Sequence, residues 1–218
     1  RRVLALLVIA MAPKPEPLGE SDYKKMGMGE ANLWLVYATA FTMFMTPGVI
    51  GASVALFGKK ADGPCTKVQT IAAAGLGPLY LGFYLLKFAG GLINANLGMA
   101  RRPTGVNVPD QHIYKVTKGS AEGSIVLMDD KDELYGPFNR AQRALQNFYE
   151  GMAFFIVDCL MAGYVFPSTT AVVMTVVGGL KVKAAVDYTK DRELRLKFGM
   201  PANILQATLG GLALVTGL

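Results

Sequence analysis

The amino-acid sequence predicts an all-α integral membrane protein. Three observations support this fold class: hydrophobic residues make up 52% of the 218 residues, charged residues make up only 17%, and long runs with little or no charge recur along the chain. A soluble domain carries about 25% charged residues, so an ordinary cytosolic enzyme is disfavoured. High hydrophobicity with little charge also excludes a disordered chain. Two cysteines and one histidine, His112, argue against a disulfide scaffold, and we expect no metal site.

Five segments have the length and apolar character of membrane-spanning helices, which need roughly 20 mainly apolar residues. The run from Ala31 to Gly58 contains no charged residue, and two later runs contain one each, Lys87 and Asp158. The Pro167-Ser168 pair marks a turn between two helices. The predicted spans cover residues 31–58, 70–100, 140–166, 169–189 and 200–218.

Charge bias orients these predicted helices. With five spans, the N-terminal arm and the regions 101–143 and 181–197 share one side of the membrane, and they contain 18 of the 22 Lys and Arg residues. The opposite side contains three, Lys59, Lys60 and Lys67. By the positive-inside rule the basic side faces the cytosol, or the stroma of a plastid. The net charge of +6 thus indicates basic loops beside a membrane, and we expect no nucleic-acid partner.

The chain divides into three parts. Residues 1–30 form an N-terminal arm whose charged start, short apolar run and Ala10-Met11-Ala12 end resemble a secretory or twin-arginine targeting signal. The alternative is an apolar arm that lies on the protein or the membrane. Residues 31–66 are expected to form an additional transmembrane helix and its loop. Residues 67–218 are expected to form a domain of four transmembrane helices.

One polar loop of this domain, 103–137, is large. It contains two short runs of alternating apolar and polar residues, 113–117 and 124–128, around a glycine-containing turn at 118–123. Such a pattern predicts a β-hairpin.

A polar stripe enters the membrane from the basic side. Arg143, Asn147 and Glu150 stand at i, i+4 and i+7, so they share one face of a helix. Arginine offers a forked donor for a carboxylate, asparagine a donor and an acceptor, and glutamate an acceptor for an ammonium. This set suits a small zwitterionic ligand with carboxylates. A network that ties helices together is an equally good interpretation of the spacing.

Two further polar elements lie at the same face. Tyr188, Arg192 and Arg195 repeat the i, i+4, i+7 spacing, and Arg101-Arg102 ends the second predicted span. Interfacial anchoring is the common role of such arginine pairs. Together these side chains define a candidate anion pocket where three helix ends meet.

Lys87 and Asp158 form a candidate ion pair inside the membrane. Lys87 precedes Arg101 by 14 residues and Asp158 follows Arg143 by 15, so at 1.5 Å per residue both lie about 21–23 Å from the basic face. Isolated charges within a span are costly and usually find partners. The sequence predicts a pair within one subunit or between subunits, with other polar neighbours or a lipid as the alternative.

The segment from Phe138 to Glu150 resembles the R-A-x-x-N-x-x-E hallmark of the family of membrane-associated proteins in eicosanoid and glutathione metabolism (MAPEG). The segment from Tyr188 to Arg195 resembles the Y-x(6)-R segment of the family, and Ala100-Arg101-Arg102 resembles the end of its first helix. The resemblance covers residues 75–218. It implies a four-helix membrane bundle that forms homotrimers, here with one additional N-terminal transmembrane helix.

The resemblance also implies that glutathione is the co-substrate and lies between neighbouring subunits near the cytosolic face. Carried over residue by residue, the glutathione-binding residues are Arg101, Arg143, Asn147, Glu150 and Tyr188. The candidates for activating its thiol are Arg102 and Arg195, because a fixed guanidinium beside the sulfur favours the thiolate, which is the nucleophile.

The implied function is that of a glutathione transferase or peroxidase that adds the thiolate to lipophilic electrophiles or reduces lipid hydroperoxides arriving from the bilayer. The alternative is a non-catalytic, MAPEG-like structural subunit of a larger respiratory or photosynthetic complex. Gly151 and Ala184, where members of the family often have tyrosine, motivate that alternative, as do the large loop and the additional helix. The resemblance favours the endoplasmic reticulum, whereas the signal-like start leaves a plastid (thylakoid) or mitochondrial membrane open.

Overall fold

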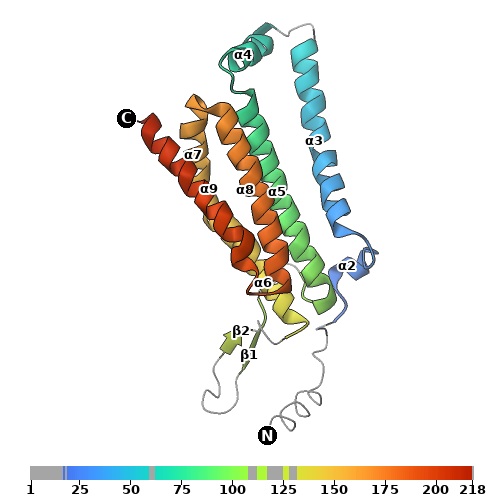
Figure 1. Cartoon of the computed structure of the whole chain (residues 1–218). Helices are drawn as coiled ribbons and strands as arrows, with labels where there is room; N and C mark the ends of the chain where they lie inside the picture. Colours follow the sequence, from blue (N-terminus) through green and yellow to red (C-terminus); the bar gives the residue numbers. More distant parts are fainter. Residues whose placement is uncertain are drawn as a thin grey trace, which may run out of the picture.

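The computed structural model describes residue 17 and residues 19–58, 62–107, 112–116, 125–127 and 132–217. The proposed targeting segment at the start of the chain lies outside the described residues. Helices dominate the described part (Figure 1). In chain order they are α2 (Asp22–Lys25), α3 (Leu33–Phe57), α4 (Asp62–Ala73), α5 (Gly77–Arg101), the 3-10 turn η1 (Arg102–Thr104), α6 (Tyr135–Glu150), α7 (Met152–Val165), α8 (Pro167–Lys190) and α9 (Arg195–Thr216).

Four helical segments of the described chain are long and apolar enough to cross a membrane. They are Leu33–Phe57, Tyr135–Val165, Pro167–Lys190 and Arg195–Thr216, and the second combines α6 and α7. A bent pair of helices, Gly63–Ala73 and Gly77–Thr104, passes the same test together and raises the count to five. These apolar helices confirm an all-α integral membrane protein, with α5, α6–α7, α8 and α9 as the bundle and α3 as the additional N-terminal helix (Figure 1).

The predicted span 70–100 is not one straight helix. It breaks between α4 and α5, whose axes differ by 95°. Gly75 adopts a left-handed backbone conformation with φ +68°, which glycine reaches at no steric cost. Pro78 then occupies the first turn of α5, where its missing N–H needs no partner. α4 therefore crosses over the end of the bundle, between α3 and α5 (Figure 1).

The core of the bundle forms where α5 and α8 approach closely. A Cβ on Gly82 would lie 3.0 Å from the Ala171 Cα, and a Cβ on Gly178 would lie 3.2 Å from the Ala89 Cβ. Small residues let membrane helices approach until their backbones are in van der Waals contact. Buried apolar side chains from α5, α6, α7, α8 and α9 complete this core, among them Leu86, Ile93, Phe148, Phe155, Met174, Val177 and Leu209.

The additional helix α3 is tied to the bundle at its N-terminal end. The forked guanidinium of Arg102 donates to the backbone carbonyls of Gly29 and Ala31, each at 2.6 Å. Further along α3, the Phe41 ring packs against the rings of Tyr84 and Phe88 on α5, with centroids 5.5 and 5.2 Å apart. The chain between α2 and α3 is thus held by charge-assisted hydrogen bonds.

The predicted β-hairpin is confirmed in the large polar loop. Strands β1 (Tyr114–Val116) and β2 (Ile125–Leu127) pair antiparallel, with Lys115 opposite Val126. The predicted turn at 118–123 lies outside the described residues. The Asn139 amide of α6 binds the residue before β1 at both backbone groups: its Oδ1 accepts from the Ile113 N–H and its Nδ2 donates to the Ile113 carbonyl, each at 2.9 Å.

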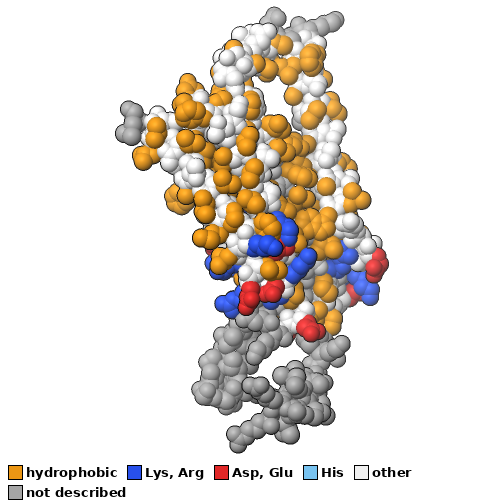
Figure 2. All heavy atoms as spheres, in the orientation of Figure 1, with side chains coloured by type: hydrophobic (Ala, Val, Ile, Leu, Met, Phe, Trp, Pro, Cys, Tyr) orange, Lys and Arg blue, Asp and Glu red, His pale blue; other side chains and the backbone are white. Residues whose placement is uncertain are grey.

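Charged side chains gather at one end of the described helices, where α2, α6 and the α8–α9 turn meet, while the rest of this face is largely hydrophobic (Figure 2). Lys87 and Asp158 are exceptions to this distribution. Their predicted pairing within one chain is wrong: the Lys87 Nζ lies 5.9 Å from the Phe41 ring centroid, and the Asp158 carboxylate faces Gly210 of α9. The pairing between subunits stays a prediction.

Replacing Arg102 tests its role as the tie between α3 and the bundle. Arg102→Ala removes two charge-assisted hydrogen bonds and is expected to lower the free energy of unfolding by about 2 kcal/mol. It should also expose the 26–32 segment to protease. Thermal unfolding and limited proteolysis in detergent measure both effects. Lys67→Ala, at an exposed position of α4, is the control. Equal protease resistance of Arg102→Ala and the control would contradict the assignment.

Candidate functional site

The site is built around the last turn of α8, which two neighbouring helices hold in place. Arg140 of α6 is buried, and its guanidinium donates to the Thr189 carbonyl at 3.1 and 3.2 Å and to the Lys190 carbonyl at 3.4 Å. The last carbonyls of a helix lack intrahelical partners, so these bonds satisfy them. From α5, the Asn96 Nδ2 donates to the Thr189 Oγ1 at 2.7 Å. The start of α9 is thereby placed beside α6.

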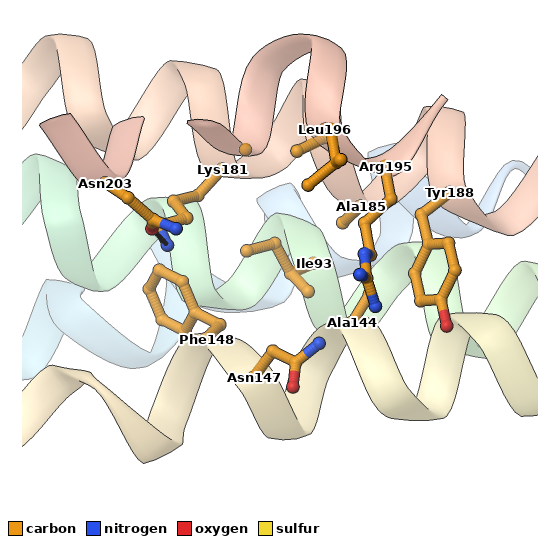
Figure 3. A pocket seen from close by; sticks show the side chains of 12 residues that line it. Ile93, Ala144, Asn147, Phe148, Lys181, Ala185, Tyr188, Arg195, Leu196 and Asn203 are labelled. Atoms are coloured by element: carbon orange, nitrogen blue, oxygen red, sulfur yellow. Dashed lines mark hydrogen bonds between the residues drawn. The ribbon is translucent and has the colours of Figure 1, made fainter. Parts of the chain in front are cut away.

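A cavity of about 340 Å³ lies between α5, α6, α8 and α9. Its volume is at the lower end of the range of about 300–1,000 Å³ found for small-molecule sites. Figure 3 shows the side chains that enter it. The lining residues are Ile93, Ala144, Asn147, Phe148, Lys181, Ala184, Ala185, Tyr188, Arg195, Leu196, Gly199 and Asn203.

Three of the predicted site residues come together in this cavity. Arg195 begins α9, and its guanidinium carbon lies 5.7 Å from the centroid of the Tyr188 ring, within cation–π range. Asn147 approaches from α6 on the opposite wall (Figure 3). The packing of Arg195 on an aromatic face fixes a positive charge at one end of the cavity.

A second polar pair, which no sequence motif predicts, lies at the other end of the cavity. The Lys181 Nζ of α8 donates to the Asn203 Oδ1 of α9 at 2.7 Å (Figure 3). The two residues are 22 positions apart, on different helices. The only sequence signal was a lysine two turns before Tyr188 on the same helix face.

Arg143 and Glu150 lie outside this cavity. The Arg143 Nη1 donates to the Glu150 Oε1 at 3.2 Å, and both side chains are about half exposed, at 44% and 51%. At 100° per residue, Asn147 is rotated by about 60° from Glu150 around the helix axis. The helix therefore directs Asn147 into the cavity while Arg143 and Glu150 pair on its outer surface.

Arg101 and Arg102 are not brought to the cavity within one chain. The Arg101 Nη1 donates to the Asn107 carbonyl at 2.7 Å, and its guanidinium lies 5.1 Å from the Phe138 ring centroid. Arg102 binds the segment before α3, as described above. Neither side chain lines the cavity.

The large loop places His112 near the outer surface of α6. The next residue in the chain, Ile113, is hydrogen-bonded to Asn139, which lies one turn before Arg143 on α6. Burial holds the pKa of His112 below its ordinary value, and the Arg143 guanidinium lowers it further. The neutral form of the imidazole is therefore favoured near Arg143.

The cavity has a donor set that suits a small anionic ligand. Arg195 supplies a fixed cation for a thiolate or carboxylate, Tyr188 a hydroxyl, and Asn147 an amide that both donates and accepts. In the described residues, no group of three or more His, Cys, Asp or Glu could hold a metal ion. The chemistry available to these side chains is anion binding and stabilisation of a nucleophile.

Comparison with known proteins gives one match. A model described as the MAPEG family matches residues 80–214, which is more than half of the chain and includes the whole cavity. No curated protein and no solved structure matches the chain.

The His112 pKa provides a test of how the large loop contacts α6. Arg143→Gln is expected to raise this pKa part of the way toward 6.5, because burial is the larger cause and remains. The folded protein binds fewer protons at His112 than the unfolded chain, so its contribution to the unfolding free energy falls as the pH drops through 6.5. NMR titration of the single histidine measures the shift, with Lys197→Gln as control. An unchanged pKa in Arg143→Gln would contradict the contact.

Proposed function

This chain is a member of the MAPEG family, which acts in membrane-associated eicosanoid and glutathione metabolism, and on that premise we propose that it is a glutathione transferase or peroxidase. The observation that carries the proposal is the convergence of Asn147, Tyr188 and Arg195 in one cavity. Glutathione is the co-substrate, and the second substrate is a lipophilic electrophile or a lipid hydroperoxide.

Arg195 is the proposed activating residue. An ordinary thiol has a pKa near about 8.5 and is mostly protonated at neutral pH. The Arg195 guanidinium, held on the Tyr188 ring, favours the thiolate of bound glutathione. Each unit by which the thiol pKa falls corresponds to about 1.4 kcal/mol, and the low dielectric near the membrane strengthens the attraction. Asn147 and Tyr188 orient the peptide so that its sulfur faces Arg195.

The lipophilic substrate reaches the cavity from the bilayer. Leu196 is part of the cavity wall and is 60% exposed. Met200 and Ile204, one and two turns further along α9, are 59% and 57% exposed. This apolar surface lies beside the cavity and faces lipid, so an apolar substrate can enter without crossing water.

The remaining predicted site residues would act at the boundary between subunits of the proposed trimer. Arg143 and Glu150 pair on the outer surface of α6, where a neighbouring subunit can approach. In this proposal they contact glutathione at the subunit boundary. Arg101 is buried in its own chain, where its guanidinium binds the Asn107 carbonyl, so we do not assign it a contact with glutathione. Arg102 holds the segment before α3 in the described structure, so we assign thiol activation to Arg195.

Turnover by an Arg195 variant tests the proposed function. Arg195→Gln keeps the length and polarity of the side chain but removes its charge. We expect kcat with a lipophilic electrophile to fall by about 10²-fold, the cost of one group that stabilises developing negative charge. Lys197→Gln, two residues away and exposed, is the matched control and should retain activity. Similar kcat values for both variants would overturn the role of Arg195.

Two assays of the wild-type protein distinguish a glutathione-dependent enzyme from a structural subunit. The proposal predicts retention on immobilised glutathione and conjugation of a hydrophobic electrophile. Failure of both, with purification at a fixed ratio to a larger complex, would favour the structural subunit.

Asn147 should affect binding rather than chemistry. Asn147→Ala removes one hydrogen-bonding amide from the cavity, and we expect KM for glutathione to rise by about tenfold while kcat changes little. Gln146→Ala, at an exposed position of the same helix, is the control. A fall in kcat with unchanged KM would contradict this assignment.

A further inference from the structure

Two charged side chains inside the membrane spans lack a counter-charge in their own chain. Lys87 of α5 is exposed, and its ammonium lies over the Phe41 ring of α3. Asp158 of α7 is partly exposed, and its Oδ2 lies 3.2 Å from the position that a Cβ on Gly210 would occupy. Among the described residues, neither side chain takes part in an ion pair or a hydrogen bond. Charged groups within a bilayer are costly and almost always have partners, so we expect each to find one in a neighbouring molecule.

The two charges lie on opposite edges of the bundle. Lys87 is on the edge where α3 packs against α5, and Asp158 is on the edge where α7 packs against α9 (Figure 1). Two turns before Lys87, Tyr80 is 58% exposed. Phe154 and Met161, one turn on either side of Asp158, are 79% and 46% exposed. One edge therefore presents a cation and the other an anion, each within apolar surface.

The depths of the two charges match. Lys87 lies 14 residues before Arg101, and Asp158 lies 15 residues after Arg143, so at 1.5 Å per residue both are about 21–23 Å from the basic face. Copies of a membrane protein that are related by rotation about the membrane normal keep every residue at one depth. Lys87 of one copy and Asp158 of the next can therefore meet.

We propose that Lys87 of one copy pairs with Asp158 of the next, so that opposite edges of the bundle join in a closed ring. A contact between two different surfaces is heterologous, and such contacts form rings when the rotation closes. Every copy in the ring then offers one cation and receives one, and neither charge is left without a partner. Helix α3, which lies outside the residues matched by the family model, holds Lys87 at this contact through Phe41. The inference goes beyond the proposed glutathione chemistry and does not depend on it.

A second copy fits these edges better than a lipid or a different protein does. Phospholipid head groups carry their charges outside the hydrocarbon core, which is about 30 Å thick. A different protein would need a basic and an acidic group at this same depth to neutralise both edges. A second copy supplies both charges at the required depth.

Charge reversal tests the pair. Lys87→Asp and Asp158→Lys each place like charges at the contact, and we expect each to raise the dissociation constant of the oligomer by at least about tenfold. The double variant restores opposite charges and should recover most of the lost affinity, which excludes misfolding as the cause. Lys67→Asp and Glu133→Lys, at exposed positions of α4 and the large loop, are the charge-matched controls. Förster transfer between labelled copies diluted in lipid bilayers measures the dissociation constant.

Two results of this experiment would overturn the proposal. One is that the single variants dissociate no more than the controls. The other is that the double variant associates no better than either single variant.

Disulfide cross-linking locates the contact directly. In a background of Cys65→Ser and Cys159→Ala, copies that carry Lys87→Cys are mixed with copies that carry Asp158→Cys and are then oxidised. We expect a disulfide-linked dimer from this mixture. Lys87→Cys mixed with Val176→Cys, on α8 and exposed at a similar depth, is the control and should not form one. Equal linking in both mixtures, or none in the first, would contradict the pairing.

Glutathione turnover by the same samples separates this inference from the proposed function. If the copies cross-link as expected but the wild-type protein neither binds nor conjugates glutathione, the proposed function fails and the interface stands. If the wild-type protein conjugates glutathione while the charge-reversal variants associate as the controls do, the interface is wrong and the proposed function stands.

Discussion

The structure depends on the hydrogen bonds that the last backbone carbonyls of α8 receive at the membrane boundary. A helix that ends there has carbonyl groups without partners, and Arg140 of α6 supplies them with donors at the Thr189 and Lys190 carbonyls. Asn96 of α5 holds the Thr189 hydroxyl from the other side. Because α9 starts five residues after α8 ends, this fixed end also determines where Arg195 lies. The cavity between α5, α6, α8 and α9 is a consequence of that arrangement.

Most of the fold could be predicted from the sequence because membrane helices depend on length and apolar composition. The hairpin followed from alternating residues around a glycine-containing turn. The break before α5 is not predicted because the run from 68 to 100 is long, mainly apolar and free of charge apart from Lys87, while only Gly75 and Pro78 indicate a turn. Apolar composition alone does not distinguish a helix that crosses the bilayer from one that lies across its surface.

The site was harder to predict because it depends on the register between helices. Asn147, Tyr188 and Arg195 were identified from their motifs and lie in one cavity. Arg143 and Glu150 share the same stripe, but a rotation of about 60° separates the position of Asn147 from that of Glu150. Lys181 and Asn203 meet only because α8 and α9 run antiparallel with one particular offset. Arg101 and Arg102 donate to backbone carbonyls, and no sequence motif predicts these hydrogen bonds.

The central claim is that the Arg195 guanidinium on the Tyr188 ring stabilises a thiolate in this cavity. The pKa of the thiol of bound glutathione, followed by thiolate absorbance across a pH titration, measures this directly. The account predicts a pKa at least about one unit below the ordinary value near 8.5 in the wild-type protein, and a return toward that value in Arg195→Gln. An ordinary thiol pKa for glutathione bound to the wild-type protein would contradict it.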